Sequence, residues 1–169
     1  MFLKSKQMKQ GTVSVLLGCH SPIHSILVII SWKKLYNKWP KFWQLICIVF
    51  HDIGHYGLDY LDNYEEKKIH WILGARIAQK LFGDKGYDFC SGHCLYSGAP
   101  LSDLYKADKY SWYIAPRWWL ISNNFFEPKL QTGFTTNREA VDSFRAQVKV
   151  SVESGEFVET HNMYLNRYR

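Results

Sequence analysis

The fold of this chain is decided around residues 48–55, which read Ile-Val-Phe-His-Asp-Ile-Gly-His. The run that leads into them, residues 42–50, leaves hardly any polar face. We therefore predict a central buried helix that is opened by Pro40 and terminated by the glycine of this motif. His51 and Asp52 would end that helix, where two adjacent ionisable side chains are costly without partners. A metal ion is one partner that suits both.

Capping and turn residues before and after this motif predict further helices. Ser21-Pro22 predicts a helix that runs through Lys34 or Tyr36, and Glu65 and Glu66 favour the start of another that ends near Phe82. The remaining helices are predicted over 87–96, 100–113, 118–126 and 137–152, with a turn at 83–86 and a loop at 129–136. No segment alternates strongly enough to predict a strand, so we expect an all-α fold, a compact helical bundle of about six to seven helices.

Composition narrows the class of partner. The 169 residues are 47% hydrophobic and carry a formal net charge of +6. This charge favours an anionic partner, either a nucleotide, a nucleic acid or a membrane surface. The apolar runs 26–32 and 42–50 fall short of the ~20 residues that cross a bilayer. We expect no membrane partner, and we find no secretory signal near the first residue.

The four cysteines carry little pairing information. Cys19, Cys47, Cys90 and Cys94 form no C-x-x-C pair, and three of them lie in apolar surroundings where a free thiol behaves as a small hydrophobic group. This pattern suits a reducing compartment, so we expect a cytoplasmic protein.

Six ionisable side chains fall on predicted helices or at their ends. They are His24, His51, Asp52, His70, His93 and Asp108. For Asp108 the periodicity is clearest, because apolar residues flank it at steps of three, four and seven, namely Leu101, Leu104, Tyr105 and Trp112. The carboxylate is therefore predicted to face the core, where either a cation or a buried lysine or arginine can compensate it.

The inward orientation of two later histidines, His70 and His93, is predicted less strongly. His70 continues the stripe of Leu73, Gly74, Ile77 and Leu81 along its helix, and His93 follows Phe89 by four residues. A single inward-facing histidine is more often a hydrogen-bonded core residue than a metal ligand. Mixed nitrogen and oxygen ligation by such residues would suit Mn, Fe, Co, Ni or Zn better than calcium.

The ordered set resembles the H…HD…H…H…D signature of the HD-domain superfamily, with a match from about Pro22 to Trp112. Residues 48–55 look like the family's core motif, His24-Ser25 like its first histidine motif and Ala107-Asp108 like its last aspartate. The resemblance implies a single HD-like domain over 1–169, with a catalytic core at about 20–128 and a C-terminal helix and tail at 129–169.

The resemblance also implies a ligand set. His24, His51, Asp52 and Asp108 would bind a first metal ion, and Asp52 would bridge to a second ion bound by His70 and His93. Asp52, His70 and His93 would then form the catalytic part of a site that holds one or two divalent transition metal ions.

The superfamily is largely phosphohydrolytic, so the expected reaction is attack of a metal-activated water on a nucleotide or another small phosphate ester. Arg76, Lys85 and Lys109 are candidates to bind the phosphate oxygens of this small anionic substrate. The same ligand pattern also resembles the diiron oxygenases of the superfamily, which include myo-inositol oxygenase and a phosphonate-degrading relative. A nucleic-acid-binding module and a purely structural metal site are further alternatives.

Two other histidines leave the ligand set open. His20 lies four residues before His24 and could replace it, although Pro22 places His20 outside the helix. His55 lies four residues after His51, but Gly54 makes a continuous helix doubtful. We therefore expect His55 to support the ligands or face the substrate.

Overall fold

The computed structural model of the protein describes residues 21–56, 64–126 and 136–154, and in these ranges it is all-α, as predicted. It contains seven α-helices and two short 3₁₀ helices: α1 (Pro22–Tyr36), α2 (Phe42–Phe50), η1 (Ile53–His55), α3 (Tyr64–Phe82), α4 (Asp84–Ser91), η2 (Leu95–Ser97), α5 (Asp103–Ile114), α6 (Arg117–Phe126) and α7 (Asn137–Glu153). No strand occurs in the described part of the chain.

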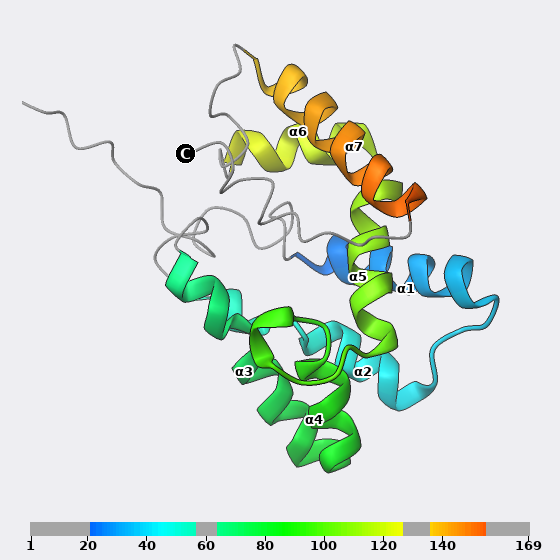
Figure 1. Cartoon of the computed structure of the whole chain (residues 1–169), viewed down its shortest axis with the longest axis vertical. Helices are drawn as coiled ribbons and strands as arrows, with labels where there is room; N and C mark the ends of the chain where they lie inside the picture. The colour runs from blue at the N-terminus through cyan, green and yellow to red at the C-terminus, as the bar shows by residue number, and fades with distance from the viewer. Residues whose placement is uncertain (1–20, 57–63, 127–135, 155–169) are drawn as a thin grey trace, which may run out of the picture.

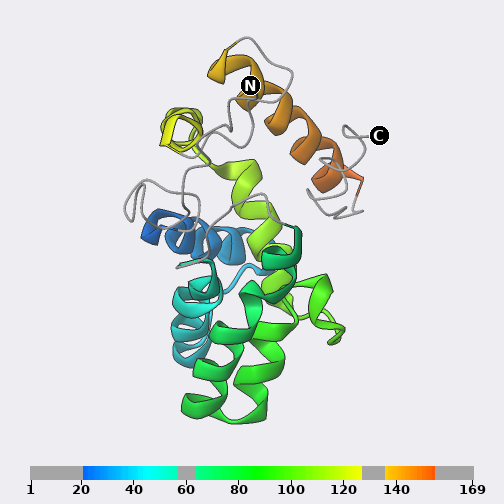
Figure 2. The ribbon, with the colours of Figure 1, turned by 90° about the vertical axis from the view of Figure 1, so that its left-hand side faces the viewer.

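The helices form two groups joined by α5. One group contains α2, α3 and α4, with α1 lying across α5 beside it, and the other contains α6 and α7 (Figure 1). A view from the side shows the same order, with α5 running from the lower group to the upper one (Figure 2). The N-terminal end of α1 and the C-terminal end of α2 both reach the middle of the molecule, which is where the candidate site lies.

Two hydrophobic clusters hold these groups together. The first lies among α1 to α5 and contains Val28, Trp32, Cys47, Ile48, Ala75, Ala78, Phe89, Cys90, Leu104 and Ala107. The second joins α1 to α5, α6 and α7 and contains Leu27, Ala115, Trp119, Leu120, Ala140 and Val141. Because α1 and α5 contribute to both clusters, they connect the two groups through packed side chains.

The first helix follows its sequence signals closely. Ser21 is extended at the N-cap and Pro22 occupies the first turn, as expected for a residue whose missing N–H needs no partner there. The helix ends at Asn37, which has a left-handed φ of 52°. Lys33 donates from its Nζ to the Asn37 carbonyl over 3.0 Å, an interaction that also complements the negative end of the helix dipole.

Three helix boundaries were predicted wrongly, two on the fourth helix and one on the fifth. The fourth helix begins at Asp84, where we expected a turn, and it ends at Ser91. Gly86 explains the difference, because a Cβ there would lie 2.4 Å from the Ala78 carbonyl oxygen. This glycine lets α4 approach α3 closely and makes no turn. The fifth helix begins at Asp103, three residues after the predicted start.

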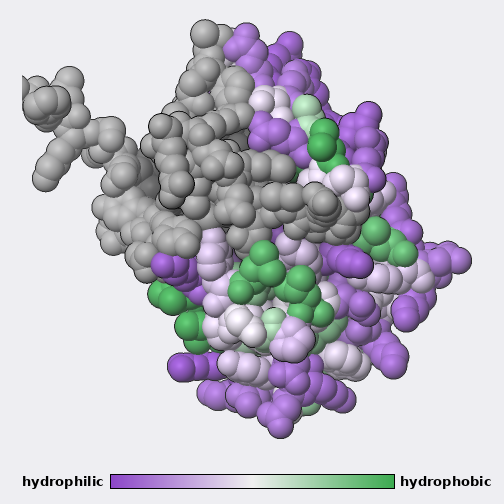
Figure 3. All heavy atoms as spheres, viewed as in Figure 1, coloured by the Kyte–Doolittle hydropathy of each residue, from purple (hydrophilic) through white to green (hydrophobic). Residues whose placement is uncertain are grey.

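Several apolar side chains that we expected in the core are exposed. Phe42 and Val49 show that α2 is not buried on all sides, and Leu73 and Leu81 lie on the outer face of α3. Leu101 precedes α5 and is also exposed. Hydrophobic side chains accordingly gather on the surface near the segment between α4 and α5 (Figure 3).

None of the helices within the described ranges is both long and apolar enough to cross a membrane. Cys47, Cys90 and Cys94 are buried free thiols, whereas Cys19 lies outside the described residues. The thiols therefore act in this structure as small core side chains, as their apolar surroundings predicted.

Candidate metal centre

Two histidines from different helices face each other at the middle of the molecule. His24 lies in the first turn of α1 and His51 caps the C-terminus of α2, and both are buried. His51 donates from Nδ1 to the Ile48 carbonyl over 2.6 Å. The Nδ1 of His24 lies 3.4 Å from the Ser111 hydroxyl, which donates its own proton to the Asp108 carbonyl. Each ring therefore uses Nδ1 as its donor, so that Nε2 faces the carboxylates and offers a lone pair when the ring is neutral.

These two Nε2 atoms point at two carboxylates. His24 Nε2 lies 3.1 Å from Asp108 Oδ1 and 3.4 Å from Asp52 Oδ2. His51 Nε2 lies 3.3 Å from the same Asp52 oxygen and 3.8 Å from the same Asp108 oxygen. The four ligand atoms all lie within 4.8 Å of one another. The structure thus brings together the four residues that were predicted to share one ion.

A second group forms around the other oxygen of Asp52. His93 Nε2 lies 3.3 Å and His70 Nε2 lies 3.7 Å from Asp52 Oδ1, and the two Nε2 atoms are 3.1 Å apart. His93 donates from Nδ1 to the Cys90 carbonyl, so its Nε2 also carries a lone pair. Asp52, His70 and His93 form a second cluster of metal-ligand type, and Asp52 belongs to both.

The chemistry of these donors fits a metal ion. The buried Nε2 of His51 makes no hydrogen bond, and it lies beside carboxylate oxygens that can only accept. A cation between them would satisfy both partners, and imidazole with carboxylate is a donor set that suits Mn, Fe, Co, Ni or Zn. A buried cluster of His and Asp residues that can hold a metal ion is therefore a property of this fold.

No protein-family model matches the chain, and searches of characterised proteins and of solved structures find no significant match.

The pKa values of the cluster show how strongly these groups interact. Burial lowers the pKa of His51, but Asp52 and Asp108 outweigh burial and raise it to about 10. The pKa of His24 is raised in the same way: burial opposes its charge, and the two aspartates favour it. Burial raises the pKa of Asp108, yet Lys109 and the two histidines hold it well below its usual range. Without a metal ion, the carboxylates thus favour the protonated form of both imidazoles.

Of the three basic residues proposed to bind substrate, one lies beside the cluster. Lys109 Nζ is 3.2 Å from Asp108 Oδ2. Lys85 instead lies over the ring of Trp43, 5.4 Å from its centroid, and Trp43 precedes His51 by eight residues, roughly 12 Å along α2.

Arg76 also lies away from the cluster. It is exposed on α3, six residues and roughly 9 Å beyond His70. The positive charge of Arg76 or Lys85 in the sequence could not show that the residue lies away from the cluster.

His55 lies against the second group, where it can support the candidate ligands. The ring of His55 is buried and stacks on His70 at a centroid distance of 4.3 Å. Its Nε2 lies 3.9 Å from Asp52 Oδ1. The signal was the spacing of four residues from His51, and the 3₁₀ helix Ile53–His55 turns this side chain toward the cluster. His20, the alternative to His24, lies outside the described residues.

Proposed function

We propose that this protein is a metal-dependent phosphohydrolase of the HD type that acts on a nucleotide or another small phosphate ester. The observation that carries the proposal is the position of Asp52. One of its oxygens faces His24 and His51, and the other faces His70 and His93. A carboxylate shared in this way is the arrangement that two neighbouring metal ions require.

The residues have distinct tasks in this proposal. His24, His51 and Asp108 would hold one ion and His70 and His93 the other, with Asp52 between them. Ions so held lower the pKa of a coordinated water toward neutrality and offset charge on phosphoryl oxygens. The Ile48 and Cys90 carbonyls keep His51 and His93 in the tautomer that offers Nε2.

Exposure indicates the side from which substrate would approach. The side chains of His70 and Asp52 are 12% and 11% exposed, whereas those of His24 and His51 are 2% and 1% exposed. The centre is therefore more open on the His70 side. Such limited exposure favours a small phosphate ester over a polymer, and the ammonium of Lys109 adds positive charge beside Asp108.

Metal analysis combined with a phosphate-release assay tests the proposal. Protein purified without added ions would be analysed for bound metal, stripped, reloaded with Mn, Co, Ni, Zn or Fe(II), and assayed against nucleotides and simple phosphate esters. We expect turnover with at least one of these metals and a loss of at least about a hundredfold for Asp52→Asn. Asp88→Asn is the matched control, because Asp88 is an exposed aspartate on α4, and it should keep full activity.

Three results would count against a hydrolase. Oxygen consumption with a polyol or a phosphonate by the iron-loaded protein, without phosphate-ester hydrolysis, would assign the site to an oxygenase. Bound metal without turnover on any ester, together with unfolding of Asp52→Asn, would assign it a structural role. Salt-sensitive binding of oligonucleotides by a protein that hydrolyses nothing would favour a nucleic-acid-binding module.

A further inference from the structure

The turn between α1 and α2 exposes two large aromatic side chains. Trp39 is 62% and Phe42 is 77% exposed, and Phe42 is the most exposed large hydrophobic residue in the described ranges. Pro40, between them, is buried, and a proline restricts the residue before it to extended backbone. Lys33 also places its Nζ 6.0 Å from the centroid of the Trp39 ring. The exposed position of Trp39 is therefore built into the turn.

The same turn is strongly basic. Residues 33–42, which we name the α1–α2 corner, contain four lysines and neither an acidic residue nor an arginine: Lys33, Lys34, Lys38 and Lys41. Of the charged groups on neighbouring elements, Asp103 lies near Tyr36, whose hydroxyl donates to the Asp103 carbonyl, and Lys85 lies over Trp43. The corner thus keeps a positive surplus after its neighbours are included.

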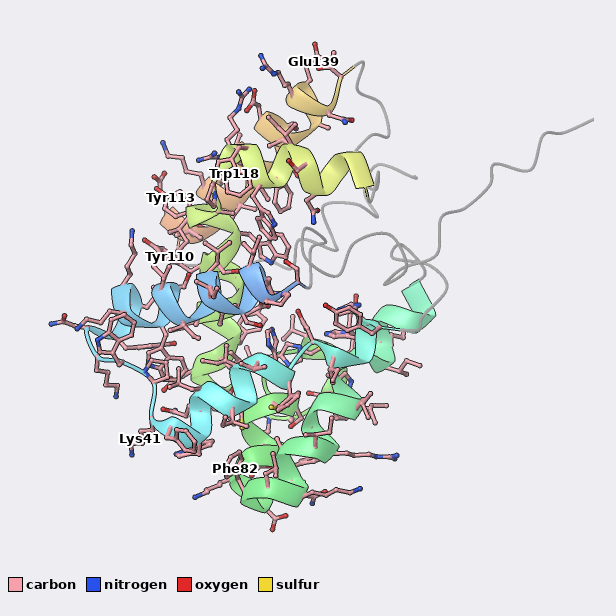
Figure 4. The ribbon with its side chains drawn as sticks, turned by 180° about the vertical axis from the view of Figure 1, so that it is seen from behind. Lys41, Phe82, Tyr110, Tyr113, Trp118 and Glu139 are labelled. Carbon is pink, nitrogen blue, oxygen red and sulfur yellow. The ribbon has the colours of Figure 1, made fainter. Side chains whose placement is uncertain are left out.

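The corner lies at the far end of two helices from the metal centre. His24 is in the first turn of α1 and His51 caps the last turn of α2, whereas the corner joins the opposite ends of these helices. Tyr36 follows His24 by twelve residues, roughly 18 Å along α1. Lys41 accordingly projects at the outer edge of the molecule, away from the upper helices (Figure 4). A partner bound at the corner would leave the metal centre open.

We propose that the α1–α2 corner docks the protein on a bilayer surface that contains anionic phospholipid. Tryptophan and phenylalanine favour the boundary between headgroups and acyl chains, and lysines beside them are attracted to the lipid phosphates. The apolar runs 26–32 and 42–50 are too short to span a bilayer, but a surface contact needs no spanning segment, and the proposal therefore departs from the expectation of no membrane partner. The proposal does not depend on the function proposed above.

The shape of the corner favours lipid over nucleic acid. Single-stranded nucleic acid is usually bound along a basic groove in which aromatic side chains stack on successive bases, and base and phosphate recognition draws on the planar fork of arginine. Here the aromatic residues project from an outer turn, and all four cations are lysines. The hydrophobic surface near the segment between α4 and α5 (Figure 3) has no comparable run of charge to indicate its partner.

Vesicle flotation with the full-length, metal-loaded protein tests the proposal. Vesicles would contain phosphatidylcholine alone or an equal mixture of phosphatidylcholine and phosphatidylglycerol. We expect binding to the mixed vesicles that weakens with added salt. Each basic residue near an anionic surface strengthens binding about fivefold, so the triple variant Lys34→Glu/Lys38→Glu/Lys41→Glu should lose at least about a hundredfold. Trp39→Ala/Phe42→Ala should lose at least about tenfold.

Matched controls separate the corner from general surface effects. Trp118 is 61% exposed on α6, far from Lys41 (Figure 4), so Trp118→Ala should bind vesicles like the parent. The triple reversal of three exposed lysines elsewhere, Lys80, Lys106 and Lys149, should weaken binding far less than the corner reversal. The circular dichroism spectrum and melting temperature should stay at the parent level in every variant, which verifies that each one folds.

Quenching by brominated lipid gives an independent readout. Trp39→Phe should still bind the mixed vesicles but should lose most of the quenching that the parent shows, because Trp39 is the tryptophan that would enter the headgroup region. Equal binding to neutral and mixed vesicles at low salt, equal losses for Trp39→Ala/Phe42→Ala and Trp118→Ala, or unchanged quenching in Trp39→Phe would overturn the proposal. Displacement of the vesicles by an oligonucleotide that needs the same residues would assign the corner to nucleic acid and would also overturn it.

Discussion

At the scale of single residues, the two oxygens of Asp52 separate two ligand groups. If both groups hold an ion, removing His70 and His93 should remove only the ion on the Oδ1 side. We predict that His70→Ala/His93→Ala lowers the bound metal from two equivalents to one, measured by inductively coupled plasma mass spectrometry after dialysis. The remaining ligands, His24, His51 and Asp108, still lie within 4.8 Å of one another and of Asp52.

A matched variant checks that the effect belongs to these histidines. His55→Ala removes a neighbouring ring that stacks on His70 and should reduce the metal content less than the double variant. Loss of both ions from His70→Ala/His93→Ala with normal helicity would show that the two groups form a single site.

The raised pKa values of two imidazoles predict how metal uptake depends on pH. The pKa of His51 is raised to about 10, so this imidazole is protonated near neutral pH in the metal-free protein, and the pKa of His24 is raised as well. A metal ion must displace the proton of His51, and its apparent affinity should fall as the pH is lowered from about 10, by up to roughly tenfold per pH unit for each proton displaced. Calorimetric titration in buffers of different ionisation enthalpy should detect at least about one proton released at neutral pH.

The same pKa shifts determine how the stability of the metal-free protein changes with pH. A group whose pKa is raised by folding stabilises the fold below its unfolded value, here 6.5, and loses this contribution as the pH rises through the folded value. Urea unfolding of the stripped protein should therefore show stability that declines between about pH 6.5 and pH 10. Metal uptake that releases no protons, with flat stability across this range, would contradict the assigned protonation.

The sequence could indicate which side chains face the candidate site but not all of their neighbours. Asp108 was predictable because Leu104 and Tyr105 lie four and three residues before it, and both are buried. Leu101 seemed to belong to the same stripe, but it precedes α5 and is exposed. His93 was expected on a helix but lies just beyond α4, because contacts distant in sequence, such as the bond from the Ser102 amide to the Gly92 carbonyl, shape this turn.

At the scale of elements, the contact between η1 and α3 is the closest in the site. A Cβ on Gly54 would lie 1.7 Å from the His70 carbonyl oxygen, which is backbone and cannot move without shifting α3. We predict that Gly54→Ala destabilises the fold by about 3 kcal/mol or more. Because Asp52 and His70 lie on the two elements forced apart, this variant should also bind less metal. Thermal unfolding and metal analysis measure the two effects.

Gly98 offers a matched control for this substitution. It has a φ of +69°, and a Cβ there would meet no atom within 4 Å. Asparagine tolerates this left-handed conformation, so Gly98→Asn should leave the metal content unchanged and cost less than about 1 kcal/mol. Equal melting temperatures for the Gly54 and Gly98 variants would show that η1 can move away from α3 freely.

Helix starts could be predicted from local sequence, whereas the buried face of a helix depended on tertiary packing. The start of α1 followed its predicted cap, Ser21-Pro22. The cap of α7 is Thr136, which forms a capping box with Glu139, whereas the sequence suggested Asn137, the first residue of the helix. On α3 the inward face is marked by small residues, Gly74 and Ala78, which are buried. Leu73 was taken as part of that face but is exposed. Hydrophobicity alone therefore misplaced the face, because close packing of helices selects small side chains as well as apolar ones.

At the scale of the whole molecule, the candidate metal centre joins elements that are distant in sequence. Its candidate ligands come from α1, the end of α2, α3, the turn after α4 and α5. The α6–α7 group contributes none of them and is held to α1 and α5 by the second hydrophobic cluster, while the exposed Arg117–Asp142 ion pair joins α6 to α7. Metal removal should therefore destabilise the ligand-bearing helices more than the α6–α7 group.

Hydrogen exchange with and without a chelator measures this difference. A ligand at a hundred times its dissociation constant stabilises the native state by about 2.7 kcal/mol, so stripping the metal should lower the melting temperature by roughly 5–10 °C. Amide protection should fall most in the N-terminal turns of α1, at the end of α2 and near His70. Amides of α7 should keep more of their protection, because no α7 residue belongs to either ligand group. A uniform loss over α7 and the ligand-bearing helices would mean that both groups open as one cooperative unit, and the two clusters, which share α1 and α5, would then have to be treated as a single core.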